Sequence, residues 1–259
     1  MTNKYILVRG DDFGNSRSSS EAIMAAHRCG LLRNASVMVT CPAVREAAVK
    51  YAKTPGLVFG LHATLTSEWD RVRWGPVLPA EQVSSLVRKD GTFCKDGAEL
   101  REQAPKPEHM LAELQAQLEL ARQLGFEIRY ADTHMGFEWV AEGFARMFDE
   151  WCLQEGVISY RSVQRRTLPE AEASLYANPV ERLIARLEVA SPGLYTLVTH
   201  PAYDDEETRA FGNEVFAGGR IAAERNGDRL MLSDGRLLDY VRESGIRPVT
   251  YVEAAELLS

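Results

Sequence analysis

The stretch YILVRGDD, residues 5–12, indicates how this chain folds, because a short apolar run ends in two adjacent carboxylates. Three further apolar runs end at a histidine, and these are His62, His134 and His200. A parallel sheet brings the carboxyl ends of its strands to one face, where ligands and catalytic groups collect. Since aspartate and histidine are common ligands of divalent metals, we expect these strand ends to meet at a metal site.

Short β-type runs alternate along the chain with longer amphipathic helical patterns. Strands are expected at residues 5–8, 36–39, 57–61, 128–131, 157–160, 195–198 and 246–250. Helices are expected at residues 18–29, 43–53, 107–124, 142–154, 169–187, 206–220 and 233–244. Ser18 and Glu21 have the spacing of a capping box at the start of the first helix.

This alternation predicts a parallel sheet covered by helices. The length of 259 residues is close to the roughly 250 residues of a (β/α)₈ barrel. We therefore expect an α/β fold, a single-domain distorted TIM-like barrel with parallel strands that spans residues 1–259. An open doubly wound sheet is the alternative, although the chain contains neither G-x-G-x-x-G nor a P-loop motif.

Residues 62–108 interrupt the alternation, because the segment is rich in proline and other turn formers and predicts at most a short helix near residues 81–88. A long excursion after a strand often forms a wall of an active site, and a plain surface insertion is the alternative. Trp69 and Trp74 lie in this segment. We expect them to bind substrate, since exposed indole faces are common platforms for sugar rings.

Composition excludes several classes of protein. A formal net charge of −7 argues against a nucleic-acid partner or an anionic membrane surface. The four cysteines form no CxxC pair, which fits buried thiols in a reducing compartment. The N-terminal apolar run is too short for a signal peptide, and no run is long enough to span a membrane. We therefore expect a cytoplasmic protein.

The acidic pair Asp11-Asp12 has two interpretations. Adjacent carboxylates at a buried strand end repel each other and require a cation or a shared proton. Alternatively, the pair precedes a helix and interacts favourably with its dipole.

The histidines also have two interpretations. Each one alone fits a core or loop residue, but three at strand ends favour a shared function. His27 and His109 lie in expected helices and are interpreted as structural. Asp132, two residues before His134, either orients a histidine from behind the metal or is a solvated strand-end residue.

These residue types suit hydrolysis. One carboxylate and two imidazoles hold a metal with open positions, which lowers the pKa of bound water to about 7 and polarises a carbonyl group. A second carboxylate would then act as general base, and a further histidine would protonate the leaving group, each contributing roughly 10²- to 10⁴-fold. We expect metal-assisted cleavage of an amide or ester.

Four motifs resemble, in order and spacing, those of the YdjC-like (ChbG/HpnK-type) carbohydrate deacetylases. They are Asp11-Asp12-Phe13-Gly14, Gly60-Leu61-His62 with Thr64-Leu65-Thr66, Asp132-Thr133-His134, and His200-Pro201. The resemblance covers nearly the whole chain. It implies a distorted barrel that removes N-acetyl groups from amino sugars or short oligosaccharides, using one divalent ion, Zn²⁺ or Mg²⁺. It also suggests a homodimer.

The resemblance further implies roles for single residues. Asp12, His62 and His134 would bind the metal. Asp11 would be the general base, by analogy with the acidic pair of NodB-type polysaccharide deacetylases, and His200 would be the general acid. Which carboxylate of the acidic pair binds the metal stays open.

The chain departs from the family pattern at two places. Asp132-Thr133-His134-Met135-Gly136 keeps only the first histidine of a common Asp-Ser-His-His-His stretch, so the substrate could differ. Arg9 stands where asparagine is common. Arg161, just after an expected strand, would bind a carbonyl or a sugar hydroxyl, or would form a surface salt bridge.

Two rival functions are also compatible with these residues. One is a metal-dependent hydrolase of another amide, ester or phosphate bond. The other is a sugar-binding barrel without turnover, against which the presence of all five acidic and histidine side chains speaks.

Overall fold

The computed structural model describes residues 3–163, 166–172 and 178–258. Its strands are β1 (Lys4–Phe13), β2 (Asn34–Val37), β3 (Val58–Ala63), β4 (Ile128–Thr133), β5 (Ile158–Ser159), β6 (Gly193–Thr199) and β7 (Arg247–Pro248). Its helices are α1 (Arg17–Arg28), α2 (Val44–Tyr51), α3 (Gly97–Glu102), α4 (Pro107–Gln123), α5 (Phe144–Gln154), α6 (Tyr160–Val163), α7 (Pro179–Val189), α8 (Glu206–Arg209), α9 (Gly218–Leu232), α10 (Gly235–Glu243) and α11 (Tyr251–Leu258), with a 3₁₀ turn, η1 (His134–Gly136), after β4.

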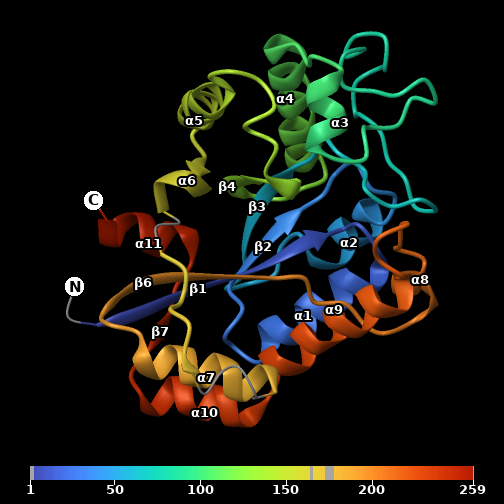
Figure 1. The fold of residues 1–259 in the computed structure, drawn as a ribbon. Helices are drawn as coiled ribbons and strands as arrows, with labels where there is room; N and C mark the ends of the chain where they lie inside the picture. The colour runs from blue at the N-terminus through green and yellow to red at the C-terminus, as the bar shows by residue number, and fades with distance from the viewer. Residues whose placement is uncertain (1–2, 164–165, 173–177, 259) are drawn as a thin grey trace.

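The strands form one parallel sheet in the order β5-β4-β3-β2-β1-β6, and β7 pairs with the first part of β1. Among the described residues no pairing joins β5 to β6, so the sheet is a half-barrel rather than a closed one. Helix α11 contacts α6, β4 and β5, and helices surround the sheet (Figure 1). The predicted fold, an α/β single domain with a distorted TIM-like barrel, is confirmed.

A bulge near the end of β1 places the acidic pair. Gly10 pairs with Ala35 and Phe13 with Val37, so β1 holds one more residue than β2 over the same distance. Such a bulge shifts the alternation of side chains along a strand. Asp11 and Asp12 therefore both lie on the concave side of the sheet, although adjacent residues of a regular strand face opposite sides.

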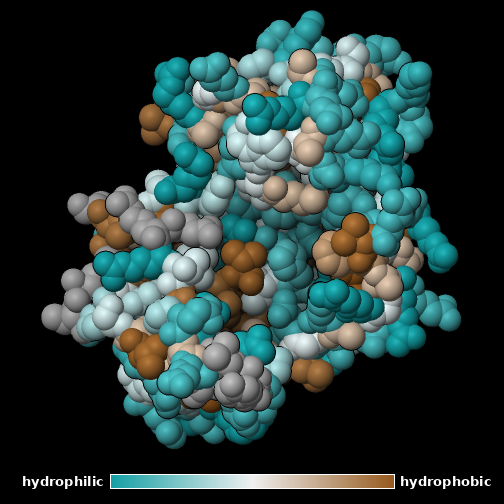
Figure 2. All heavy atoms as spheres, viewed as in Figure 1, coloured by the Kyte–Doolittle hydropathy of each residue, from teal (hydrophilic) through white to brown (hydrophobic). Residues whose placement is uncertain are grey.

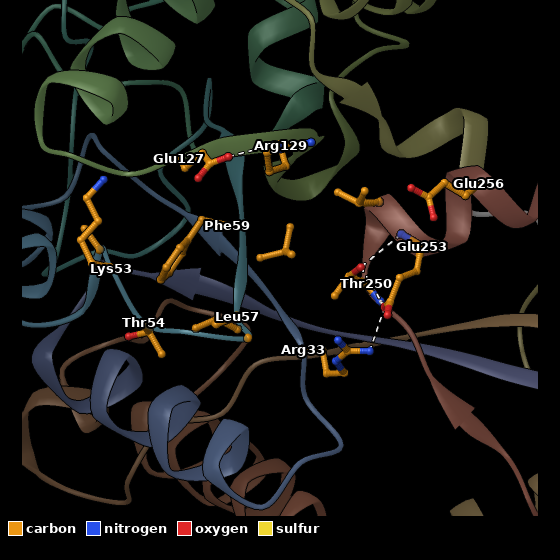
Figure 3. Close-up of a pocket in the computed structure, with 14 residues that line it drawn as sticks. Arg33, Lys53, Thr54, Leu57, Phe59, Glu127, Arg129, Thr250, Glu253 and Glu256 are labelled. Carbon is orange, nitrogen blue, oxygen red and sulfur yellow. Dashed lines mark hydrogen bonds and ion pairs between the residues drawn. The ribbon is translucent and has the colours of Figure 1, made fainter.

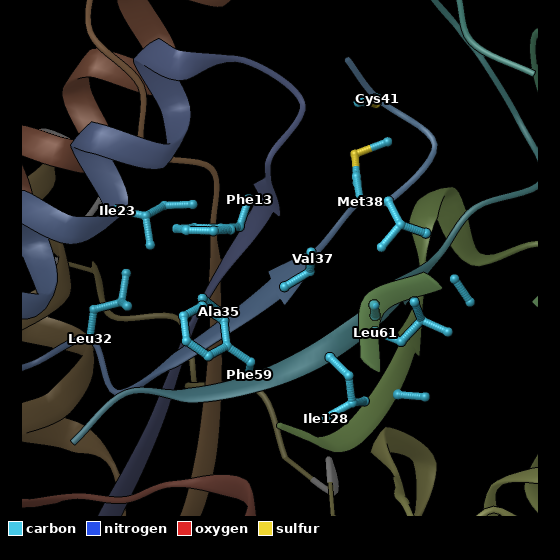
Figure 4. Close-up of a cluster of buried hydrophobic side chains, with 14 of the residues drawn as sticks. Phe13, Ile23, Leu32, Ala35, Val37, Met38, Cys41, Phe59, Leu61 and Ile128 are labelled. Atoms are coloured by element: carbon cyan, nitrogen blue, oxygen red, sulfur yellow. The ribbon is translucent and has the colours of Figure 1, made fainter. Parts of the chain in front are cut away.

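Two buried clusters fix the sheet from its two sides. On the helix side Phe13 packs edge-on against Phe59 and Phe126, with ring centroids 5.4 and 6.1 Å apart, and Figure 4 shows this cluster around Phe13, Val37 and Phe59. On the concave side Tyr130 of β4 stacks on Tyr251 of α11 at 3.8 Å. The stacked rings therefore fill part of the concave side between β4 and α11.

All seven expected strands are confirmed, and most expected helices occur with small shifts of their ends. The expected capping box at Ser18 and Glu21 is wrong. Helix α1 begins at Arg17 and its N-cap is Ser16, two residues before Ser18, because the side chain of Ser16 accepts the backbone N–H of Ser19 at 3.0 Å. Residues 62–108 were expected to contain at most a short helix near residues 81–88, but that stretch forms turns and the segment contains helix α3 at Gly97–Glu102 instead.

Two expected helices have different bounds. The one at residues 206–220 is interrupted, because a Cβ on Gly218 would lie 1.9 Å from the carbonyl oxygen of Arg209, and the chain must turn back there between α8 and α9. The one at residues 169–187 begins only at Pro179, after Asn178 caps the N–H of Glu181. Residues 173–177 of that prediction lie outside the described residues.

The face of the molecule in Figure 2 is mostly hydrophilic, and its apolar residues form small separate patches. In the described part of the chain, no helix is both long enough and apolar enough to traverse a lipid bilayer.

Candidate metal centre and active site

Three ligand atoms from three separate parts of the chain converge at the carboxyl ends of the strands. Asp12 Oδ1 lies 3.5 Å from His62 Nε2 and 3.6 Å from His134 Nδ1, and the two nitrogens are 3.3 Å apart. All three side chains are buried. Ligands bonded at 2.0–2.1 Å around a tetrahedral Zn²⁺ lie about 3.4 Å from each other. The separations therefore suit one shared cation.

Each of the two imidazoles is hydrogen-bonded to a carboxylate on the side away from the shared point, and this bond determines which ring nitrogen faces that point. His62 Nδ1 donates to Asp132 at 2.5 Å, and His134 Nε2 donates to Glu68 at 2.9 Å. Because an ionised carboxylate only accepts, each ring carries its proton on that side. The lone pairs of His62 Nε2 and His134 Nδ1 are thus directed at the shared point, as in the carboxylate–histidine pairs of metal proteins.

Asp12 provides the observation that tests whether a metal fits. Its Oδ2 pairs with Arg225 at 2.7 Å. Its Oδ1 is buried and has no hydrogen-bond partner among the described residues. A buried carboxylate oxygen without a partner is costly, and two lone pairs that face each other repel. A divalent cation would satisfy all three atoms, so the donor set fits a metal.

A second cluster of possible metal ligands, Asp11, His62 and Asp132, has the side chain of Arg9 between its two carboxylates. Arg9 donates to both oxygens of Asp11, at 2.5 and 2.8 Å, and its Nη1 lies 2.9 Å from Asp132 Oδ2. The same Nη1 is 3.0 Å from the hydroxyl group of Tyr251. A guanidinium thus already supplies the positive charge between these carboxylates, which separates this cluster from the triad.

The charges at the site shift several pKa values. Burial alone would raise the pKa of Asp12, but Arg225 and the two imidazoles outweigh it and hold the pKa well below its ordinary value. Burial likewise opposes ionisation of Asp11, and Arg9 outweighs it, so the pKa of Asp11 is also lowered. Burial would lower the pKa of His62, but Asp132 and Asp11 raise it to about 10. The carboxylates around His62 therefore favour positive charge at the shared point, where a proton on His62 Nε2 and a metal ion would compete.

His200 lies beside this cluster and is reachable from solvent. Its Nε2 is 4.0 Å from Asp11 Oδ2, and its side chain is 44% exposed. Its backbone N–H donates to Asp228 of α9 at 2.8 Å, and burial raises the pKa of that carboxyl. The backbone position of His200 is thus fixed while its ring remains accessible to a ligand.

The other sequence-predicted residues have different environments. Trp69 and Trp74 are only 6% and 4% exposed, so the expectation of exposed indole faces is wrong. The Trp74 ring packs against His134, with centroids 6.0 Å apart, and its N–H donates to the carbonyl oxygen of Thr66. Arg161 pairs with Asp149 at 3.2 Å, and both side chains are about 40% exposed, as in the surface salt bridge that was the alternative.

His27 and His109 have the structural roles that were expected. The two ring nitrogens of His27 lie 2.9 and 3.3 Å from the carbonyl oxygens of Leu32 and Pro55. His109 bonds to the hydroxyl group of Ser85 at 3.0 Å. Neither ring takes part in the metal triad.

The sequence analysis missed the roles of Glu68, Arg225 and Asp228. Glu68 lies six residues after His62 in the irregular segment, and the other two lie on α9, which was not expected to begin at Gly218. No motif marks them, because each contributes one charge from a segment without a repeating pattern. Arg9 was noted only as a departure from the family.

A separate cavity of about 520 Å³ lies at the opposite end of the strands, where β2, β3 and β4 begin. Figure 3 shows the side chains that line it. Arg33 pairs with Glu253 at 2.8 Å, and Arg129 with Glu127 at 2.8 Å. These charges compensate each other, and none of the metal-triad residues lines this cavity.

Comparison with known proteins agrees with the motifs. The family described as YdjC-like protein matches residues 5–243. The chain belongs to this family. A carbohydrate deacetylase of Thermoanaerobacter pseudethanolicus is 25% identical over 261 residues, which cover 96% of this chain and 98% of that protein. A carbohydrate deacetylase of Geobacillus stearothermophilus is 25% identical over 98% of this chain and 99% of its own length.

A solved structure from Enterococcus faecalis V583, named as a candidate cellobiose-phosphate cleavage protein, shares the fold of this YdjC-like chain. It superposes with a TM-score of 0.79 at 21% identity, and the match covers 97% of this chain and 98% of that one. This likeness supports the half-barrel architecture.

Proposed function

We propose that this YdjC-like protein is a divalent-metal-dependent deacetylase that acts on N-acetylated amino sugars or short oligosaccharides. The observation that carries the proposal is the convergence of Asp12 Oδ1, His62 Nε2 and His134 Nδ1 within 3.6 Å of one another, with Asp12 Oδ1 buried and lacking a partner. The names of the full-length relatives support the substrate class.

Asp12, His62 and His134 would hold the ion. A divalent ion bound there would polarise an acyl oxygen and make a water molecule a better nucleophile at neutral pH. Two imidazole ligands favour Zn²⁺ over Mg²⁺, which prefers an all-oxygen shell. The remaining chemistry is proton transfer by neighbouring side chains.

Asp11 and His200 would move the protons. Arg9 keeps Asp11 in the ionised form that a general base requires and fixes both of its oxygens, and Asp11 would accept a proton from water through a remaining lone pair. His200, with its exposed ring 4.0 Å from Asp11, would donate a proton to the departing amine. Asp132 would orient His62, and the excursion at residues 62–108 would form one wall of the active site, with Glu68 behind His134.

The proposal is tested by measuring acetate release from N-acetylglucosamine and N-acetylated chitooligosaccharides. We expect activity that EDTA abolishes and Zn²⁺ restores. His134→Ala should lose both the bound metal and the activity. His200→Ala should retain the metal, measured by elemental analysis, and lose roughly 10²- to 10⁴-fold in turnover.

Several outcomes would contradict the proposal. Full acetate release after complete removal of the metal would exclude the metal mechanism, and unchanged turnover in His200→Ala would make that histidine structural. Bound metal with no acetate release, together with hydrolysis of a phosphoester, would indicate the rival hydrolase class. Tight sugar binding without any turnover would indicate a binding protein.

A further inference from the structure

Asp132 is not the only charged residue that bonds to a candidate metal ligand and fixes its orientation. Each of the three candidate ligands has one charged partner on the side away from the shared point. His62 has Asp132, His134 has Glu68, and Asp12 has Arg225. The last two partners come from outside the sheet, one from the excursion at residues 62–108 and one from α9.

Arg225 holds Asp12 from a position that is itself fixed. Its side chain is only 10% exposed. Its guanidinium carbon lies 5.9 Å from the centre of the Trp69 ring and 5.8 Å from that of Phe211, both within the range of a cation–π contact. Because the guanidinium cannot move freely, its bond to Asp12 Oδ2 fixes the orientation of the carboxylate and leaves Oδ1 directed at the two imidazoles.

Glu68 holds His134 in a similar way. Its Oε2 accepts from His134 Nε2 at 2.9 Å, so the lone pair of His134 lies on Nδ1. The backbone around Glu68 is also fixed, because Asn213 Nδ2 donates to its carbonyl oxygen at 3.2 Å and the N–H of Asp70 donates to Gly212 at 2.9 Å. These bonds join the excursion to the segment between α8 and α9.

We infer that Glu68 and Arg225 are positioning residues that fix the orientation of the metal ligands His134 and Asp12. The inference deepens the proposed function, because it rests on the same metal site. It assigns a role to the buried Trp69 as well. That indole holds the guanidinium that orients a ligand, instead of offering a face to a sugar ring.

The test measures metal affinity in the absence of substrate. Chelator-treated full-length protein is titrated with Co²⁺, and both the dissociation constant and the visible absorption spectrum are recorded. Glu68→Gln and Arg225→Lys should each weaken Co²⁺ binding by roughly 10- to 100-fold, and the spectrum should change because a ligand is less well oriented. Far-UV circular dichroism should show that both variants fold.

The chain offers a matched control for each variant. Arg229→Lys changes a second arginine of α9, whose guanidinium lies 4.6 Å from the centre of the Tyr203 ring. Glu102→Gln removes one negative charge from an exposed position in the same excursion. Both controls should bind Co²⁺ with the wild-type affinity and spectrum.

The outcomes separate this inference from the proposed function. If wild-type protein binds Co²⁺ but Glu68→Gln and Arg225→Lys do so with unchanged affinity and spectrum, the positioning roles are overturned while the metal site stands. If wild-type protein does not bind Co²⁺ or Zn²⁺ at all, the metal site itself fails. If the controls weaken binding as much as the test variants, the effect is one of general charge and the inference fails.

Discussion

Single residues in this protein are constrained by neighbours that are remote in sequence. Gly60 belongs to the Gly60-Leu61-His62 motif, and a Cβ at this position would lie 2.3 Å from the ring of Tyr130. That ring cannot move away easily, because it stacks on Tyr251 at 3.8 Å. The glycine is therefore required by close packing on the concave side of the sheet, two residues before the proposed ligand.

We expect Gly60→Ala to reduce the free energy of unfolding by about 1–3 kcal/mol, the usual cost of overpacking a well-filled core. Urea denaturation followed by circular dichroism measures this change. Gly125→Ala is not a suitable control, since Gly125 has a φ of 93° and would be strained in any case. Gly235→Ala is suitable, because nothing lies within 4 Å of a Cβ there. Equal stability of Gly60→Ala and wild type would refute the packing argument.

The sequence indicated the candidate metal ligands but not the residues that support them. Asp12, His62 and His134 could be selected because each follows an apolar run, and in a parallel sheet that position leads to one face. Arg225 could not be selected, since an arginine within a helix carries no sign of what it faces. The burial of Trp69 was also unpredictable, because it depends on contacts with Phe211 and Arg225 from a segment far along the chain.

At the scale of elements, helix α11 closes the concave side of the sheet, and a capping box fixes its first turn. Thr250 and Glu253 have the required spacing. Glu253 Oε2 accepts the backbone N–H of Thr250 at 2.7 Å, and Thr250 Oγ1 accepts the N–H of Glu253 at 3.2 Å. Tyr251, the first residue of α11, bonds to Arg9 at 3.0 Å, so this cap also supports the residue that holds Asp11.

The cap has a predictable pH dependence. Burial alone would raise the pKa of Glu253, but the hydrogen bonds from Thr250 and Arg33 outweigh it, and the pKa is lowered. A carboxyl whose pKa is lowered on folding stabilises the protein above its ordinary pKa, and this contribution disappears as the pH falls through the lowered value. We therefore expect Glu253→Gln to lower the midpoint of urea unfolding at pH 7, and much less at about pH 3.

A difference between Glu253→Gln and wild type that is equally large at both pH values would contradict this assignment. The loss would then reflect packing or geometry rather than the charge of the carboxylate.

Element boundaries show where sequence patterns suffice. The strands were all identified, because branched and aromatic residues cluster in short runs. Helix α9 was not, since Gly218, Gly219 and Gly227 weaken its pattern, and the turn before it depends on the close approach of Gly218 to Arg209. Helix α11 was also missed, because its start at Tyr251 follows the last short strand, β7, so closely.

For the whole molecule, the proposed metal site links distant parts of the chain. Its ligands come from β1, β3 and the turn after β4, and their supporting residues come from the excursion and from α9. A ligand that binds only the folded state adds free energy of unfolding through mass action. Metal binding should therefore stabilise the entire domain.

We expect Zn²⁺ at about 100 times its dissociation constant to add about 2.7 kcal/mol to the free energy of unfolding of chelator-treated protein. The same Zn²⁺ should not raise the melting temperature of Asp12→Asn, which loses the charge of a ligand. Differential scanning calorimetry measures both. A similar increase in the two proteins would show that the ion acts elsewhere on the surface.

The bulge in β1 has a consequence for how mutations near the acidic pair should be interpreted. Before it, odd-numbered residues such as Leu7 and Arg9 face the hollow of the half-barrel, and after it Phe13 faces the helices instead. The inserted residue thus reverses which positions of the strand, odd-numbered or even-numbered, face inward. Deletion of either residue between Gly10 and Phe13, Asp11 or Asp12, would remove one carboxylate and also restore the regular alternation, which would leave only one strand position for an aspartate on the hollow side.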